Sequence, residues 1–498
     1  MMICLLTVGA SGLNSAAAQS RATACLAQME AKGPGVAAGP ATTQFILALQ
    51  QELAPGNWNK PVMVGPYKVT FANPGRNPSL WSPDDFDKLI PAATVPQGEL
   101  RKRLVQKGKG AAFVGIRTPS DEHKAVHPFT KGGAYLAPVS VVVEFGGLTD
   151  GREAVVYLYN STSAPEDLEA DFTAPVEIAI KESMTYRQAT MAMLRPGKYV
   201  HSAGLQMPLP YQPGKIPVVF VHGLDSAPRT WENVYNELGA APSIREHYQF
   251  WFFRYPTGEP VPLSAAQLRQ SLQAARAFYD PKRKNKSFEE MVIIGHSMGG
   301  MLTRMQVTES GDAFWNLLST TPFDQMAMPD ADRDIFKSCL FFQPQPFVKR
   351  VVFVSTPHKG SNLASGGAGL LMDRFIQSPV AIMGAAGNMA NVVVPGISPD
   401  FAAILKEIPT GLDNLKPENG FVRLLQVQPV HVPCHSLIGT QGLFRNGKPV
   451  TDGVVPYWSS HLDCAQSEFW VPSGHEAHNH PMAVPEFERI LKLHLGFQ

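Results

Sequence analysis

The sequence predicts an α/β fold in which helices cover both faces of a mostly parallel sheet, preceded by a separate β-rich domain. The chain has 498 residues, more than one hydrophobic core usually holds, so we expect two domains. From about residue 214 onward, short apolar strands alternate with amphipathic helices, which is typical of parallel strands joined by crossover helices. Between about residues 60 and 200, β-branched runs broken by Gly, Asp, Asn and Pro indicate strands with few helices.

Six short and almost entirely apolar runs are the predicted strands of the parallel sheet, because a strand covered on both faces has no polar side. They are residues 218–221, 250–253, 291–294, 351–354, 435–438 and 468–471. Two helices are predicted from apolar residues at helical spacing. The first presents Leu268, Leu272, Ala275 and Tyr279 after Ser264 as its N-cap, and the last presents Val484, Phe487, Leu491 and Leu495.

The domain boundary is predicted at residues 207–217, where four prolines favour a stiff linker. We therefore expect a β-rich domain of unknown role over 40–205 and an α/β domain over 214–498. Within the β-rich domain, two apolar runs flank Gly-Leu-Thr-Asp-Gly and predict a hairpin, and a third run predicts another strand. These runs are residues 139–145, 154–160 and 176–181.

Composition and charge exclude whole classes of function. Lys and Arg total 43 against 42 Asp and Glu, a net charge of +1, so no global field attracts nucleic acid and none is expected as a partner. A hydrophobic content of 44% with 17% charged residues describes an ordinary globular protein. Past the N-terminus no stretch reaches the roughly 20 apolar residues of a membrane helix, so we expect a soluble or peripheral protein.

The N-terminus resembles a secretory signal. A short apolar run is followed by Ala16-Ala17-Ala18, so residues 1–18 are the predicted signal peptide, with cleavage before Gln19. Such signals usually begin with a positive charge, but no Lys or Arg precedes Arg21, which leaves open a truncated start or a different role. The signal predicts export to the periplasm, the cell envelope or the medium.

The five cysteines are too few and too scattered for a disulfide scaffold or a zinc site. They are Cys4, Cys25, Cys339, Cys434 and Cys464. Cys434 and Cys464 lie near two elements expected to be neighbours, so they either pair in an oxidising compartment or stay as thiols. Lipoprotein anchoring through Cys25 is the remaining alternative, although the preceding Ala-Thr-Ala fits that signal poorly.

The clearest chemical motif is the G-x-S-x-G pentapeptide at residues 295–299, directly after an apolar strand and before a helix-forming segment. A serine on a sharp strand-to-helix turn needs small neighbours, which Gly295 and Gly299 supply. The start of the helix then places backbone N–H groups, that of Met298 first, where they stabilise a developing negative charge. We therefore predict that Ser297 is a nucleophile.

A second N–H donor is expected from the loop after an earlier strand, and the run Val-Val-Phe-Val-His-Gly-Leu at 218–224 fits that demand. Leu224 is the predicted donor. His222 and Gly223 are predicted to shape the loop, with Gly223 letting the backbone approach a substrate oxygen. The alternative is a tight turn around a hydrogen-bonded core histidine.

These motifs resemble the α/β-hydrolase superfamily, and more narrowly its bacterial lipase and GPI inositol-deacylase-like branch. The resemblance covers about the C-terminal 280 residues and does not extend to the β-rich domain. The serine motif in its context is specific for the superfamily, and four further runs suggest the branch. They are His222-Gly223, Tyr255-Pro256-Thr257-Gly258, Ser355-Thr356-Pro357-His358-Lys359-Gly360-Ser361 and Asp452-Gly453-Val454-Val455-Pro456.

The resemblance implies that an acidic residue and then a histidine follow the serine along the chain. Asp452 comes after the predicted strand 435–438, and its role would be to hold the imidazole in one tautomer. Asp463 is its main rival. An Asp-Gly pair in a loop is otherwise simply a turn.

For the histidine, the loop between the last strand and the last helix offers His475, His478 and His480. A spacing similar to that of related lipases favours His475, and His478 is the rival. His461 precedes the last strand, which suits a structural role. A metal site made of the three clustered histidines would lack carboxylate or thiolate ligands at a recognised spacing.

The expected activity is hydrolysis of a carboxylic ester through an acyl-enzyme, with no metal or organic cofactor. Two insertions, 309–345 and 362–432, are too long for simple connections, and His358 either lines the acyl pocket or packs under such a lid. If the insertions cover the site, the substrate is a small-molecule or lipid ester with a hydrophobic part, and peripheral contact with a lipid surface is allowed. The same residues would serve an acyltransferase or a thioesterase, whereas a non-catalytic binding protein would need a broken triad.

Overall fold

A computed structural model of the chain describes residues 15–32, 39–51, 60–74, 86–131, 133–145, 152–162, 165–182, 186–199, 202–361 and 415–497. The chain divides into two compact units, Met1–Ala179 and Ile180–Gln498. The division therefore comes earlier than the proline-rich segment, residues 207–217. That segment instead joins β9 (Gly204–Gln206) to β10 (Ile216–Val221), two strands of one sheet.

The first unit contains a six-stranded sheet in the order β1-β2-β7-β6-β5-β3. Its strands are β1 (Val62–Val64), β2 (Tyr67–Ala72), β3 (Lys88–Pro91), β5 (Ala111–Arg117), β6 (Tyr135–Phe145) and β7 (Arg152–Asn160). The predicted hairpin is confirmed, because β6 and β7 pair antiparallel with Phe145 opposite Ala154. The Gly-Leu-Thr-Asp-Gly turn itself lies outside the described residues. β2 and β7 are the parallel pair of this mainly antiparallel sheet.

The segment predicted as a strand at residues 176–181 is a helix, α4 (Thr173–Glu182). Its β-branched run indicated a strand, but the preceding Asp171 sets a helix start. One oxygen of its carboxylate accepts hydrogen bonds from the N–H groups of Thr173 and Ala174 at 3.0 and 2.9 Å, while Arg103 holds the other at 2.7 Å. The unpredicted helices and strands of the first unit are α1 (Ser15–Glu30), α2 (Gly39–Leu49), α3 (Asp121–Val126), β4 (Val105–Gln106) and β8 (Ala170–Asp171), and α5 (Tyr186–Leu194) is an unpredicted helix of the second unit.

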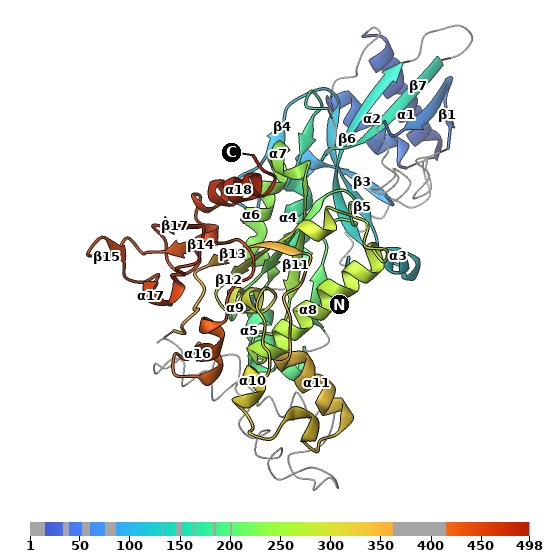
Figure 1. The fold of residues 1–498 in the computed structure, drawn as a ribbon. Helices are drawn as coiled ribbons and strands as arrows, with labels where there is room; N and C mark the ends of the chain where they lie inside the picture. The colour runs from blue at the N-terminus through green and yellow to red at the C-terminus, as the bar shows by residue number, and fades with distance from the viewer. Residues whose placement is uncertain are drawn as a thin grey trace. The chain divides into compact units, whose positions relative to one another are not determined.

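The second unit contains a seven-stranded sheet in the order β17-β14-β13-β12-β10-β11-β9 (Figure 1). Besides β9 and β10, its strands are β11 (Tyr248–Arg254), β12 (Met291–His296), β13 (Val348–Val354), β14 (Cys434–Gly439) and β17 (Ser467–Val471). All six predicted strands are present and parallel. The edge strand β9 pairs antiparallel with β11 and was not predicted, because three residues carry no recognisable pattern.

Helices cover both faces of this sheet, as predicted. On one face, α6 (Glu232–Ala240), α7 (Pro242–Arg245) and α18 (Ala483–His494) pack over alternate strand residues in one hydrophobic core (Figure 1). That core includes Val218, Phe220, Val292, Ile294, Trp231, Leu238, Phe487 and Leu491. On the other, α9 (Met298–Arg304) packs on β10, β12 and β13, and α8 (Val261–Tyr279) packs on α9.

The predicted helix cap at Ser264 is wrong by one turn, because α8 already begins at Val261. A proline in the first turn has its φ fixed near the helical value and starts the helix there. Ser264 is buried inside the helix, where its hydroxyl donates to the side-chain carboxyl group of Glu259 at 3.4 Å.

The first predicted insertion, 309–345, folds into α10 (Ala313–Asn316), a short 3-10 turn (Phe323–Gln325) and α11 (Asp330–Leu340), which packs on α8. Most of the second, residues 362–414, lies outside the described residues. The residues on either side of 362–414 lie together, since the N–H of Ser361 donates to the carbonyl of Leu415 at 2.7 Å. The helix α16 (Gly420–Val427) follows.

Residues 1–14 of the predicted signal peptide lie outside the described residues, and Ser15–Ala18 belong to the first turns of α1. In the part of the chain that the structure describes, no helix combines the length and the apolar character that a membrane span needs.

Two helix glycines give a matched test of this packing. A Cβ at Gly300 in α9 would collide with the side chain of Thr356, in the loop after β13, whereas a Cβ at Gly239 in α6 would meet nothing within 4 Å. We expect Gly300→Ala to lower the free energy of unfolding by about 1–3 kcal/mol through overpacking. Gly239→Ala should raise it by up to about 1 kcal/mol, because alanine is the better helix former. Urea unfolding of both variants measures the difference, and equal effects would contradict the packing described for α9.

Candidate active site

Ser297 lies on a sharp turn between β12 and α9. Its φ of 53° and ψ of −125° fall in a region that side chains rarely adopt, so the turn stores strain. Two backbone hydrogen bonds hold it, from the N–H of Ser297 to the carbonyl of Val354 and from the N–H of Gly300 to the carbonyl of Ser297, both at 2.9 Å. The serine is 5% exposed, and the strained turn leaves its hydroxyl at the carboxyl edge of the sheet.

The glycines around Ser297 are required by close packing. A Cβ at Gly295 would lie 2.6 Å from the carbonyl oxygen of Gly299, and a Cβ at Gly299 would collide with the carbonyl oxygens of His222 and Val221. No side chain fits at either position without moving the backbone. The predicted role of Gly295 and Gly299 in shaping the turn agrees with these distances.

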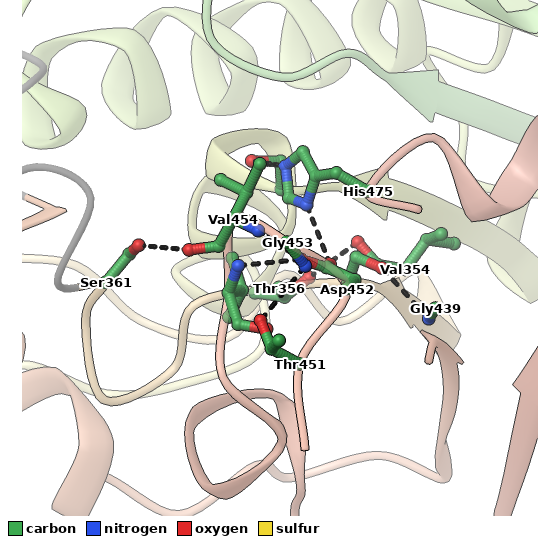
Figure 2. Close-up of polar contacts among 12 residues, drawn as sticks. Val354, Thr356, Ser361, Gly439, Thr451, Asp452, Gly453, Val454 and His475 are labelled. Atoms are coloured by element: carbon green, nitrogen blue, oxygen red, sulfur yellow. Dashed lines mark hydrogen bonds and ion pairs between the residues drawn. The ribbon is translucent and has the colours of Figure 1, made fainter. Parts of the chain in front are cut away.

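The structure brings the three predicted residues Ser297, His475 and Asp452 together. His475 Nε2 lies 2.8 Å from Ser297 Oγ, and His475 Nδ1 lies 2.8 Å from Asp452 Oδ2. Figure 2 shows the imidazole of His475 above Asp452 and its loop. Because an ionised carboxylate can only accept a hydrogen bond, Nδ1 carries the ring proton and Nε2 is left with a lone pair facing the serine hydroxyl.

Asp452 is buried, yet its environment favours the charged form. Burial by itself would raise the pKa of this carboxyl, but the hydrogen bond and charge of His475 and the N–H groups of Val454 and Val455 outweigh it and lower the pKa. Those N–H groups donate to Asp452 Oδ1 at 2.8 and 2.7 Å. Both carboxylate oxygens are therefore engaged, which fixes the orientation in which Oδ2 meets the imidazole.

The loop of residues 355–361 braces the acid loop (Figure 2). Ser361 Oγ donates to the carbonyl of Val454, and Ser459 Oγ donates to the carbonyl of Gly360 at 2.6 Å. His358 is buried with its ring edge on Phe353, at 4.6 Å between ring centroids. His358 is therefore held in the interior, while most of the insertion expected to cover it lies outside the described residues.

The loop after β10 lies directly beside the nucleophile. A Cβ at Gly223 would be 2.9 Å from Ser297 Cβ, so only glycine allows this approach. Tyr255 donates its hydroxyl proton to the carbonyl of His222 at 2.7 Å and stacks on the His222 ring at 4.5 Å, which fixes the loop. Among the described residues, no turn or loop hydrogen bond engages the N–H groups of Leu224 and Met298, which is what their predicted role as donors requires.

The rival candidates lie elsewhere. His478 is buried and its Nε2 is 2.8 Å from Thr230 Oγ1. Asp463 is exposed next to His461, whose Nδ1 is 2.6 Å from Glu468. His480 Nδ1 accepts from the N–H of Met482. Among the described residues, no cluster of three or more His, Cys, Asp or Glu side chains is placed to hold a metal ion.

Sequence reasoning missed His296, the residue before the serine. Its Nε2 donates to the carbonyl of His475 at 3.0 Å, and its ring lies 4.8 Å from that of His475 and 4.4 Å from that of His478. Burial, with the neighbouring charge of His475, lowers the pKa of His296 to about 4, so it is neutral near pH 7. Its position inside the motif could have drawn attention to it, but its partner is 179 residues away.

A family model described as the alpha/beta hydrolase family matches residues 218–484, which is more than half of the 498 residues. The chain belongs to the alpha/beta hydrolase family. The matched region begins in β10 and ends in α18, so it contains every site residue described above. A search of curated proteins found no match.

Among solved structures, this alpha/beta hydrolase is similar to several lipases. The lipase BlEst2 of Bacillus licheniformis in its mature form is 17% identical, with 56% of this chain and 93% of that chain covered and a TM-score of 0.31. Lipase 1 of Pelosinus fermentans is 14% identical over 57% of this chain and 98% of that chain, with a TM-score of 0.35. The phospholipase PlaB of Legionella pneumophila is 17% identical over 50% of this chain and 46% of that chain, with a TM-score of 0.27. With such scores, the family assignment rests on the family model.

The low pKa of His296 makes the stability of this alpha/beta hydrolase depend on pH. In the unfolded chain the imidazole has its ordinary pKa of 6.5, whereas in the folded chain the pKa is about 4. Below pH 6.5 the unfolded chain therefore binds a proton that the folded chain does not, and stability falls as the pH drops from 6.5 to 4. We expect His296→Gln to make this fall shallower by about 1 kcal/mol per pH unit. Urea unfolding across that range measures it, and parallel curves for wild type and variant would contradict the burial of a neutral imidazole.

Proposed function

We propose that this alpha/beta hydrolase cleaves carboxylic esters through an acyl-enzyme intermediate formed on Ser297. The observation that supports this best is the continuous hydrogen-bond chain from the hydroxyl of Ser297 through the imidazole of His475 to the buried carboxylate of Asp452. A nucleophile, a base and a group that orients the base are the three parts that nucleophilic catalysis needs.

In the proposed acylation step, Ser297 Oγ attacks the ester carbonyl carbon while His475 Nε2 takes the hydroxyl proton. Asp452 keeps Nδ1 protonated and stabilises the imidazolium that forms. The negative charge on the carbonyl oxygen of the tetrahedral intermediate is accepted by the N–H groups of Leu224 and Met298. His475 then returns its proton to the alkoxide, the ester C–O bond breaks and the alcohol leaves.

In the proposed deacylation step, water attacks the acyl-enzyme and His475 removes its proton. The bond to Ser297 Oγ breaks, the serine recovers its proton from the imidazole, and the carboxylic acid leaves. Because these two reaction steps need only side chains and backbone N–H groups, we propose no cofactor for them. The non-catalytic alternative required a broken triad, and the hydrogen-bond chain here is complete.

A fluorophosphonate probe tests the nucleophile directly. We expect the wild type to be labelled on one serine and Ser297→Ala to remain unlabelled, because the probe reacts with an activated hydroxyl. His475→Ala should slow labelling by about a thousandfold or more, since the base that takes the serine proton is lost.

The control is His480→Ala, which removes a neighbouring histidine of the same loop whose contacts lie outside the triad. It should be labelled at the wild-type rate. A wild type that resists the probe, or a Ser297→Ala variant labelled as fast as wild type, would end the proposal.

We further propose that the substrate carries a substantial hydrophobic acyl or alkyl part. The long insertions at 309–345 and 362–432 in the hydrolase domain motivate this proposal, since an apolar cover favours apolar substrates. Hydrolysis of nitrophenyl esters of increasing chain length is the test. We expect kcat/KM to rise by about tenfold or more from acetate to medium chains, because each buried CH₂ contributes about 0.8 kcal/mol. A clear preference for acetate would remove the lipase interpretation and leave an esterase.

Export also remains a proposal, supported by the apolar run and the alanines that end at residue 18. Cleavage before Gln19 would remove the start of α1 and keep its buried residues Ala22, Leu26 and Met29. N-terminal sequencing of the protein recovered outside the cytoplasm tests this proposal. Exported protein that still begins at Met1 would contradict cleavage before Gln19.

A further inference from the structure

A tight β-hairpin lies between β14 and the acid residue of the site. Its strands β15 (Phe444–Arg445) and β16 (Lys448–Pro449) pair antiparallel. Asn446 and Gly447 between them have positive φ values of 50° and 74°. Two successive positive φ values are those of a type I′ turn, for which Asn-Gly is the preferred sequence. The local sequence therefore specifies this hairpin.

Apolar side chains gather on and beside this hairpin. In the described part of the chain, five of the fifteen exposed large hydrophobic side chains come from residues 443–470. They are Leu443 (51% exposed), Phe444 (52%), Val450 (43%), Trp458 (46%) and Trp470 (37%), and we call them the aromatic hairpin surface. Both exposed tryptophans among the described residues belong to it. Exposed apolar side chains gathered in one region indicate an interaction site, whereas single ones scattered over a surface do not.

The surface is held in place by its own contacts. The ring of Phe444 lies 5.9 Å from that of Trp470, and the ring of Tyr457 meets Trp470 edge-on at 6.1 Å. The N–H of Tyr457 donates to the carbonyl of Val450 at 3.0 Å, which ties α17 (Tyr457–Ser460) to the hairpin. Hairpin, helix and β17 therefore present one continuous group of rings.

Two exposed cations lie on the hairpin, and two carboxylates lie on the segments beside it. Arg445 and Lys448 are exposed on either side of the turn. The carboxylate of Glu468, on β17, accepts hydrogen bonds from Tyr457 at 2.9 Å, from the indole N–H of Trp470 at 2.7 Å and from His461 at 2.6 Å. Exposed Asp463 lies 3.1 Å from His461 Nε2. The hairpin itself thus offers two cations among apolar rings.

The hairpin is also joined to the candidate active site. The N–H of Gln441 at its base donates to the carbonyl of Ser473 at 2.8 Å, two residues before His475. A Cβ at Gly453, next to Asp452, would collide with the side-chain amide of Gln441. Whatever binds the hairpin is therefore held close to the loops that carry the acid and the base.

We propose that the aromatic hairpin surface seats this hydrolase on an anionic lipid surface, an inference that rests on the proposed function and names the form in which its substrate is met. Leu443, Phe444 and the tryptophans enter the boundary between headgroups and acyl chains, where amphipathic aromatic rings are favoured. Arg445 and Lys448 bind the lipid phosphates. A second copy of the chain fits less well, because two copies would bring these cations together.

The test is sedimentation with vesicles of phosphatidylcholine, with and without phosphatidylglycerol, in the Ser297→Ala background so that no lipid is hydrolysed. The chain should bind the anionic vesicles. Leu443→Ser with Phe444→Ser should weaken binding by about tenfold or more through lost apolar burial. Arg445→Gln with Lys448→Gln should weaken it by about fivefold for each charge and reduce its dependence on salt. The matched control Phe278→Ser removes an equally exposed ring (48%) on α8 and should bind as the parent does.

Each other outcome overturns the proposal. The hairpin variants binding as well as the control, or no binding to anionic vesicles, would exclude this surface as a lipid contact. Concentration-dependent dimers that Phe444→Ser abolishes would assign it to a second copy instead. Fluorophosphonate labelling of the same substitutions in the active chain separates the two proposals. Hairpin variants should be labelled as fast as wild type, and a chain that binds vesicles but is never labelled contradicts the proposed function alone.

Discussion

The strained backbone at Ser297 is the constraint on which the rest of the site depends. A side chain held at a φ of 53° costs about 1–3 kcal/mol, so the surrounding structure must over-determine the turn. It does so from three strands: β12 supplies the residue, β13 accepts its N–H through Val354, and β10 ends in the loop where Gly223 meets the serine side chain. Since all three strands must be in register for these contacts to form, the fold and the site are specified together.

The buried ionisable side chains around this turn differ in their charge. The imidazoles of His222, His296 and His358 are buried, and burial lowers the pKa of each, so they stay neutral near pH 7. Asp452 is equally buried but remains charged, because two backbone N–H groups and His475 all donate to it. Asp452, which faces the imidazole next to Ser297, is thus stabilised as an anion. His296 instead donates a hydrogen bond to the backbone carbonyl of His475.

The sequence was informative where one short segment determines its own structure. Continuous apolar runs predicted all six parallel strands, and the glycine-flanked Ser297 was recognisable because the turn depends on its immediate neighbours. Asp452 and His475 were predicted from chain order, and the structure brings both to Ser297. The sequence-based predictions failed where residues far apart in the chain determine the local structure. A strand was predicted where Asp171, held by Arg103, starts α4, and no local pattern linked His296 to a carbonyl 179 residues away.

The topology explains why a binding surface can lie next to the reactive site without a change in the pairing of the strands. Parallel strands deliver their carboxyl ends to one edge of a sheet, so the loops after β12, β14 and β17 converge on Ser297, Asp452 and His475. A segment inserted after β14 leaves the strand register untouched, because it is closed by its own turn before the chain returns to Asp452. The Asn446-Gly447 hairpin is such an insertion. Phe444 and the two cations of the hairpin are thereby added to the edge that carries the chemistry, whereas the same residues on the opposite edge would be separated from the site by the length of the strands.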